Sequence, residues 1–233
     1  MILLLTSYAF AVEPLQPDWP LPVEDDHPRS LLLVDQLELR VPGLPGSAAT
    51  DIEGWYGGDR DRFRLRAEGA LDLADGRGDA ELGLAYSRLV GPWIELQVGA
   101  GAEAQNESGA GWESRLEVGL EYVVPYDIDL ELFLRVSHRG RVSTRVTAIK
   151  ELRFSQRLIL QGRVEATAAA QASVDLDSPA GLEAAVAGLR LRYEARRELA
   201  PYLGVQWTGG LAPPSSTGFQ SAAQVVGGLR IWR

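Results

Sequence analysis

The chain of 233 residues contains no cysteine, one methionine and two histidines. Without cysteine it can form neither disulfides nor thiolate metal sites. It also lacks any run of about 18 uninterrupted apolar residues, which excludes a membrane-spanning helix. Its net charge of −9 disfavours a nucleic-acid partner, because nucleic acid requires clustered lysine and arginine. A chain of this length forms one domain.

Apolar and polar residues alternate along almost the whole chain, in stretches of about ten residues. Examples are RFRLRAEGALD (62–72), DIDLELFLRVS (127–137) and RLILQGRVEAT (157–167). Successive side chains of a strand point to opposite faces, so each stretch has one apolar face and one charged face. The pattern predicts an all-β fold, an antiparallel up-and-down transmembrane β-barrel of the outer-membrane type with about 12 strands. A soluble sandwich or lipocalin-like barrel also alternates, but its sealed core has no use for so many charges.

Twelve strands are predicted, an even number, as expected for one chain with both ends on the same side of the membrane. They cover residues 31–42, 51–58, 61–73, 78–90, 93–105, 112–124, 127–138, 142–154, 157–170, 182–197, 201–209 and 222–232. The even-numbered connections are short and the odd-numbered ones are mostly long, as in barrels that have tight periplasmic turns and longer outside loops. Only the seventh connection, around His138 to Arg141, is short where a long loop is expected.

Aromatic residues gather near the short-turn ends of the predicted strands. They are Trp55, Tyr56, Phe63, Tyr86, Trp93, Tyr122, Tyr126, Phe154, Tyr193, Tyr202 and Trp232. This placement predicts a girdle of amphipathic rings at the depth of the lipid headgroups. The alternative is the ordinary aromatic enrichment of any β protein, which would scatter the rings over both strand ends.

The same alternation assigns charged side chains of both signs to the lumen. They are Arg64, Arg66, Glu68, Glu81, Glu95, Arg115, Glu117, Glu121, Asp129, Glu131, Arg135, Arg145, Glu151, Arg163, Glu165, Arg190, Arg192 and Glu194. Because the signs are balanced, we expect arginine–carboxylate pairs that brace a narrow interior. The alternative is a polar pathway in which Glu117, Glu121, Asp129 and Glu131 form an acidic patch that attracts cations.

The N-terminal region differs from the rest. Residues 1–11 combine a short apolar run with Ala9-Phe10-Ala11, which predicts a signal peptide with a small-x-small cleavage site. The alternative is an N-terminal tail that is retained. Residues 12–30 are acidic and rich in proline, which predicts a flexible leader before the barrel of residues 31–233.

Several segments resemble the outer-membrane copper resistance protein B family. They are GWYGGDRDRFRLRAEG, DAELGLAYSRLVGPWIELQVGAG, ELRFSQRLILQGRVEA, GLRLRYEARRELAPYLGVQW, the closing GGLRIWR and, where the leader ends, DDHPRSLLLVDQLE. The resemblance covers about residues 25 to 233. It implies a β-barrel in the outer membrane of a Gram-negative cell that serves copper resistance or homeostasis.

Two features depart from the family pattern. Family members often carry an N-terminal segment rich in methionine and histidine, suited to collecting copper, whereas the only methionine here is Met1. Capture of copper by a thioether cluster is therefore not expected of this chain. The resemblance also implies an aromatic last residue, where this chain ends in Trp232-Arg233.

Few residues qualify as copper ligands. His27 follows Asp25 and Asp26, and this imidazole beside carboxylates could hold Cu(II) weakly through nitrogen and oxygen. The alternative is a solvated acidic turn. In the lumen, the candidate ligands are the four carboxylates Glu117, Glu121, Asp129 and Glu131.

Two functions are open at this stage, and neither is enzymatic. His138 is the sole imidazole in the predicted barrel, and its neighbour Ser137 points to the opposite face, so a local Ser/His pair cannot form. The first function is a barrel that binds or passes copper ions at the outer membrane and contacts lipid and a periplasmic copper-binding protein. The second is a structural or narrow-pore barrel with no metal role of its own.

Overall fold

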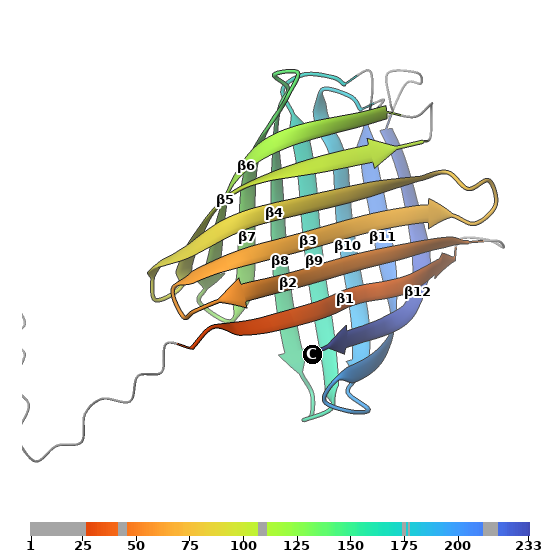
Figure 1. The fold of residues 1–233 in the computed structure, drawn as a ribbon. Helices are drawn as coiled ribbons and strands as arrows, with labels where there is room; N and C mark the ends of the chain where they lie inside the picture. The colour runs from red at the N-terminus through yellow and green to blue at the C-terminus, as the bar shows by residue number, and fades with distance from the viewer. Residues whose placement is uncertain (1–26, 42–45, 107–110, 174–175, 177, 212–218) are drawn as a thin grey trace, which may run out of the picture.

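A computed structural model describes residues 27–41, 46–106, 111–173, 176, 178–211 and 219–233. Twelve strands form one closed antiparallel barrel (Figure 1), and each strand pairs with its neighbours in the sequence. The strands are β1 (Arg29–Val41), β2 (Ser47–Gly57), β3 (Asp61–Asp72), β4 (Gly78–Gly91), β5 (Ile94–Gln105), β6 (Gly111–Val124), β7 (Ile128–Ser137), β8 (Val142–Arg153), β9 (Leu158–Ala169), β10 (Gly181–Tyr193), β11 (Leu199–Leu211) and β12 (Phe219–Trp232). The predicted fold class and strand number are confirmed.

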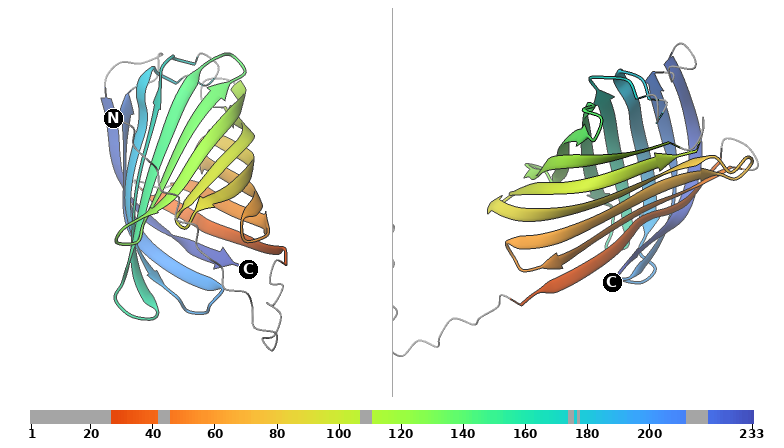
Figure 2. Two further views of the ribbon diagram at one scale, coloured as in Figure 1. Left: turned by 90° about the vertical axis from the view of Figure 1, so that its left-hand side faces the viewer. Right: turned by 45° about the horizontal axis from the view of Figure 1, so that its top comes forward.

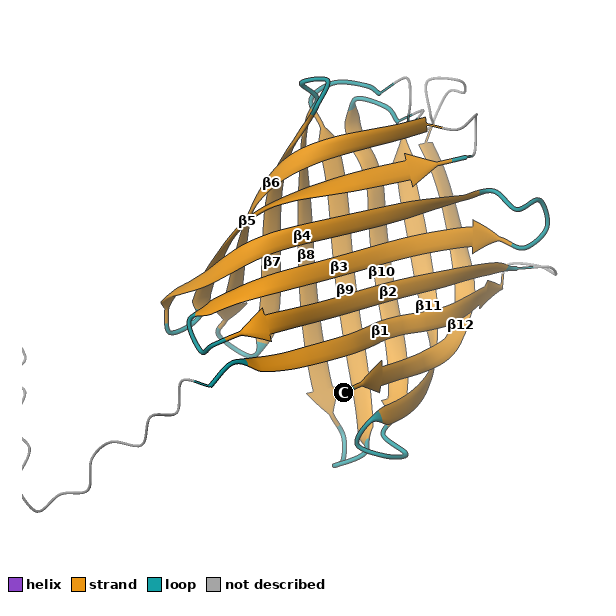
Figure 3. Ribbon diagram, in the orientation of Figure 1, coloured by secondary structure: helices purple, strands orange, loops and turns teal. Residues whose placement is uncertain are grey.

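Strands and turns account for all described secondary structure (Figure 3). No helix in the described part of the chain is long and apolar enough to cross a membrane. Most strands start and end within about three residues of the prediction. Two boundaries differ most: β2 begins at Ser47, four residues before the predicted start, and β10 ends at Tyr193, four residues before the predicted end. The predicted signal peptide and most of the predicted leader lie outside the described residues.

The barrel closes where β1 meets β12. Leu33 lies opposite Trp232, and Leu32 and Arg233 exchange two backbone hydrogen bonds of 3.0 and 2.9 Å. A β-bulge interrupts β1 between Val34 and Gln36. Because a bulge adds one residue to one strand, it shifts the alternation of side chains. Asp35 and Gln36 are therefore both buried inside, at 8% and 5% exposure.

Polar side chains are buried and hydrophobic side chains are exposed in this barrel, which is the reverse of a soluble protein. Among the described residues, buried polar and charged side chains outnumber buried hydrophobic ones, and large hydrophobic residues are exposed on every strand wall. On β7, for example, Leu132, Leu134 and Val136 are exposed while Arg135 is 4% exposed. The apolar face therefore points outward to lipid and the charged face points inward, as the alternation predicts.

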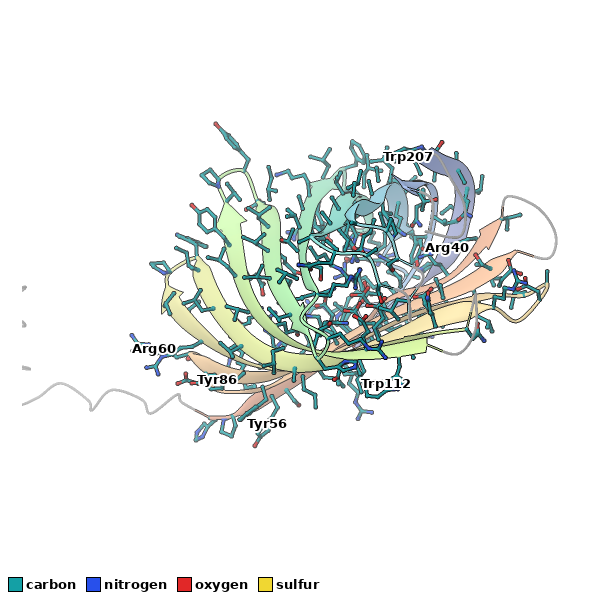
Figure 4. All side chains as sticks on the ribbon, turned by 90° about the horizontal axis from the view of Figure 1, so that it is seen from above. Arg40, Tyr56, Arg60, Tyr86, Trp112 and Trp207 are labelled. Carbon is teal, nitrogen blue, oxygen red and sulfur yellow. The ribbon has the colours of Figure 1, made fainter. Side chains whose placement is uncertain are left out.

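The barrel has two walls that cross. Strands β1–β6 pass in front of β7–β12 at a steep angle in Figure 1, and the turned views in Figure 2 show the same two groups. Seen from above, the space between the walls is filled with side chains (Figure 4). Hydrogen bonds from Arg145 on β8 to Glu68 on β3 and from Arg163 on β9 to Asp51 on β2 join the walls across the lumen.

The predicted girdle is present but smaller than expected. Tyr56 and Tyr86 project outward from the wall (Figure 4), and the rings of Phe63 and Tyr86 meet edge to face at 5.8 Å. Three of the predicted girdle residues point inward instead. Tyr202 is 6% exposed and donates to Glu38, and Trp55 and Trp232 share the face of the luminal charges on their strands. The prediction was wrong for these three because it used position along the strand and not the face.

Candidate functional site

The lumen carries a continuous row of carboxylates across five neighbouring strands. In strand register, Asp51 on β2 lies opposite Glu68 on β3, which lies opposite Glu81 on β4. The row continues through Glu103 on β5 to Glu113 on β6. Like charges directly opposite one another on adjacent strands are destabilising. The row is therefore compatible with a stable barrel only where positive charge is placed against it.

Arginines supply that charge, most of them from the other wall. Arg145 lies 3.0 Å from Glu68 and 2.8 Å from Glu81, and Arg135 lies 3.1 Å from Glu81. Arg115, next to this row on β6, also pairs with Glu81. Three guanidiniums thus surround one carboxylate, and charge-assisted hydrogen bonds of this kind are among the strongest in proteins. The expected brace of arginine–carboxylate pairs is confirmed.

A second row of carboxylates lies nearer the short-turn end. Glu95 on β5, Glu121 on β6 and Glu131 on β7 stand opposite one another in register. Arg64 neutralises the first two, with nitrogen–oxygen distances of 2.8 Å to Glu95 and 2.6 Å to Glu121. Gln97 also donates to Glu121 at 3.1 Å. These contacts leave Glu131 as the member of the row without an arginine.

Glu131 and Glu53 are luminal carboxylates that none of the described arginines neutralises. Neither forms an ion pair within 4.0 Å with any described residue, and the two are close enough for their charges to interact. Glu53 lies on β2, two residues beyond Asp51 on the same face. Glu53 is missing from the predicted luminal residues, although the alternation Asp51-x-Glu53 places it in the lumen.

The remaining predicted ligands are spread out. Glu117 is 4% exposed and lies 3.5 Å from Arg115 and 3.8 Å from Arg135, so arginines already neutralise it. Asp129 is exposed at the short-turn end of β7. His27 is exposed just before β1, whereas Asp25 and Asp26 lie outside the described residues. Within the described ranges, no group of three or more histidine or carboxylate side chains is arranged to hold a metal ion.

Two cavities occupy the ends of the lumen. The first, of about 630 Å³ at the long-loop end, is lined by Glu103, Glu113, Arg135 and Arg145 among others. The second, of about 760 Å³ at the short-turn end, is lined by Glu151, Arg192, Arg230 and Trp232 among others. The two share no lining residue. On β9, Arg163 lies between Glu165, which lines the first cavity, and Ile159, which lines the second, so its ion pair with Asp51 lies between two polar chambers.

The loop between β9 and β10 contributes to the first chamber. Ser173 donates to Glu113 at 2.5 Å and is 4% exposed, and Leu176 is 3% exposed. Arg141 contacts Glu113 at 3.6 Å and also pairs with Glu183. The described part of this loop is thus fastened to the inner face of the barrel.

Comparison with known families matches residues 29–232 to the family described as copper resistance protein B precursor (CopB). The chain belongs to the copper resistance protein B family. It is 32% identical to copper resistance protein B of Escherichia coli, over 90% of this chain and 71% of that protein. It is 30% identical to the copper resistance protein B homolog of Pseudomonas syringae pv. tomato, over 90% of this chain and 72% of that protein.

A solved outer-membrane barrel has the same general fold. The KdgM porin matches with a TM-score of 0.52 and 12% identity, covering 87% of this chain and 98% of that one. Membership of the copper resistance protein B family, together with the barrel fold, places this protein in the outer membrane of a Gram-negative bacterium, with a role in copper resistance. The family and the fold point to a non-enzymatic role.

Proposed function

We propose that this barrel binds copper ions weakly in its lumen and passes them across the outer membrane. Family membership supports copper as the cargo. The observation that carries the proposal is the pair Glu53 and Glu131, which no described arginine neutralises within 4.0 Å in a lumen otherwise full of ion pairs. Carboxylate oxygens without a bound guanidinium are available to a cation, and weak binding suits passage because the ion must also leave.

His27 extends the proposal to the periplasmic side. It lies two residues before β1, which begins at the short-turn end of the barrel. Its imidazole, together with Asp25 and Asp26, offers nitrogen and oxygen ligands of the kind that suit Cu(II). The same segment is where we propose that a periplasmic copper-binding protein contacts the barrel. Asp129 is proposed to act through the negative potential that it adds at the short-turn end, not as a ligand. Glu117 and Glu121 are neutralised by arginines and are proposed to belong to the brace.

Calorimetric titration of the refolded protein in detergent with Cu(II) and Cu(I) tests the proposal. We expect weak Cu(II) binding that falls in the double variant Glu53→Gln/Glu131→Gln, and a second loss in His27→Ala. Glu198→Gln is the matched control, since Glu198 is an exposed carboxylate in the β10–β11 turn. Equal binding in the double variant and in the control would remove Glu53 and Glu131 from the proposal.

A second candidate is a structural barrel with no metal role of its own. It is favoured by the ion pairs that fill the lumen and by the lack of a three-ligand group among the described residues. Deleting the gene separates the two candidates. Copper passage predicts altered growth on copper plates that the unchanged gene restores and the Glu53→Gln/Glu131→Gln gene does not. Unaltered growth after deletion would favour the structural role.

A further inference from the structure

One inward position in the middle of the barrel carries an aromatic ring instead of a charge. The inward residues of β7 are Asp129, Glu131, Phe133, Arg135 and Ser137. Phe133 is 2% exposed and is the largest fully buried side chain in the described part of the chain. An apolar ring at this position does not contribute to the ion-pair brace, so its presence requires another explanation.

The ring of Phe133 packs against a stretch of backbone that carries no side chain. Gly119 on β6 is directly opposite Phe133 in strand register. A Cβ atom on Gly119 would overlap the ring at Cε1, Cδ1 and Cζ, so the ring occupies the space that any other residue would fill. Glycine at this position therefore permits close approach of a neighbouring group, as it does elsewhere in strands.

The other face of the ring is covered from the opposite wall. The guanidinium of Arg66 on β3 lies 4.0 Å from the ring centroid, and that of Arg135 lies 5.8 Å away. Arg66 also donates to Gln97, which is 1% exposed. Phe133 is thus packed between Gly119 on β6 and Arg66 on β3. This sandwich of three residues reaches from one wall of the barrel to the other.

This sandwich lies between the two chambers. Arg135, two residues along β7 from Phe133, lines the chamber at the long-loop end. Phe133 itself lines neither chamber, but Arg145, directly opposite it on β8, lines the first, and the second chamber begins further along β8 at Glu151. The ring therefore belongs to the partition that separates the two polar spaces.

Phe133 is the uncharged member of that partition, and no ion pair holds it in place. Its contacts with Arg66 and Arg135 are cation–π contacts, whereas ion pairs hold the charged residues around it. A ring can leave its place by rotating about its side-chain bonds, and Gly119 has no side chain to retain it. The arginines and carboxylates around it would have to exchange charged partners to move.

We infer that Phe133 is the closing residue of the lumen, and that the two chambers join when its ring leaves Gly119. The inference goes beyond copper, because it concerns any small ion that the barrel passes. Three residues on three strands, Phe133, Gly119 and Arg66, then determine which ions pass through the lumen.

Conductance in planar bilayers containing potassium chloride tests this inference without copper. The unchanged protein should give no single-channel steps, and Phe133→Ala should give them. Leu134→Ala is the matched control, because Leu134 is the next residue on β7 and faces lipid with 52% exposure. Heat-modifiable migration on gels verifies that each variant is folded. A folded Phe133→Ala protein without steps, or an unchanged protein with equal steps, would overturn the inference.

Two further variants keep the test decisive if Phe133→Ala does not fold. Phe133→Leu keeps an apolar side chain while removing the ring, and should also open the lumen. Phe133→Cys introduces the sole cysteine of the chain. A charged methanethiosulfonate reagent should then block the current through that variant, and an open current that the reagent leaves unchanged would contradict the assignment. Because these measurements use potassium chloride, their results do not depend on the result of the copper titration.

Discussion

The guanidinium of Arg163 on β9 lies 2.7 Å from the carboxylate of Asp51 on β2, although 112 residues separate them in the chain. The pair joins the two walls of the barrel across the lumen. Asp51 is 7% exposed, and the same guanidinium lies 3.1 Å from Glu165 and 3.9 Å from Asp35, so one arginine contacts three carboxylates. The interior of this barrel is therefore held together by charges that are far apart in sequence.

Replacing Arg163 by alanine should destabilise the barrel strongly. The change leaves Asp51 in the interior without its arginine, whereas Asp35 keeps Arg230 at 2.9 Å. Breaking a buried pair in this way costs about 3 kcal/mol or more. Urea unfolding in detergent micelles measures the loss. Arg153→Ala is the control: its side chain is 76% exposed and 4.0 Å from Glu151, so about 1 kcal/mol or less is expected. Equal losses in both variants would contradict this account.

Tyr202→Phe should cost about 1 kcal/mol, the usual value of one hydrogen bond. The hydroxyl of Tyr202 donates to Glu38 at 3.1 Å, and Glu38 also accepts from Arg190 and Arg40. Glu38→Ala should cost more than Tyr202→Phe, because it leaves Arg190, 3% exposed, without its carboxylate. Thermal unfolding of both variants gives the order. The outward-facing Tyr193→Phe serves as the control and should leave stability unchanged.

An arginine on the lipid-facing wall should destabilise the barrel according to its depth. Leu134 lies near the middle of β7 and faces outward, so Leu134→Arg should cost about 2–4 kcal/mol. Phe154 directly follows β8 at the short-turn end, where the same substitution should cost about 1 kcal/mol or less. Reversible folding into lipid vesicles measures both. If Leu134→Arg proved as stable as Phe154→Arg, the outer face would not be in contact with hydrocarbon.

The protein should fold only in the presence of detergent or lipid. Its exposed surface carries large hydrophobic residues on every wall, and contiguous apolar surface of that extent is not stable in water. Circular dichroism and gel migration with and without heating provide the measurement. A monodisperse, well-folded protein in plain buffer would contradict the orientation of the two strand faces.

Much of the candidate site could be predicted from alternation, but its contacts could not. Glu121 and Glu131 were both assigned to the lumen, and the structure places them opposite each other in register. Which of them is neutralised depends on Arg64, which reaches from β3 to Glu121 on β6. Phe133 was overlooked, although alternation puts it inside, because an aromatic residue within a strand has an ordinary explanation in its β propensity.

The sequence alone predicts the fold class, the number of strands, the luminal face of β3 to β10 and the end at which the short turns lie. These follow from alternation and turn length, which are local properties of a strand. Three features become known from the folded barrel: which charges pair, where the bulge in β1 turns Asp35 and Gln36 inward together, and that Phe133 packs against Gly119. Those contacts depend on how the two walls cross, and the alternation of residues along a single strand does not specify that geometry.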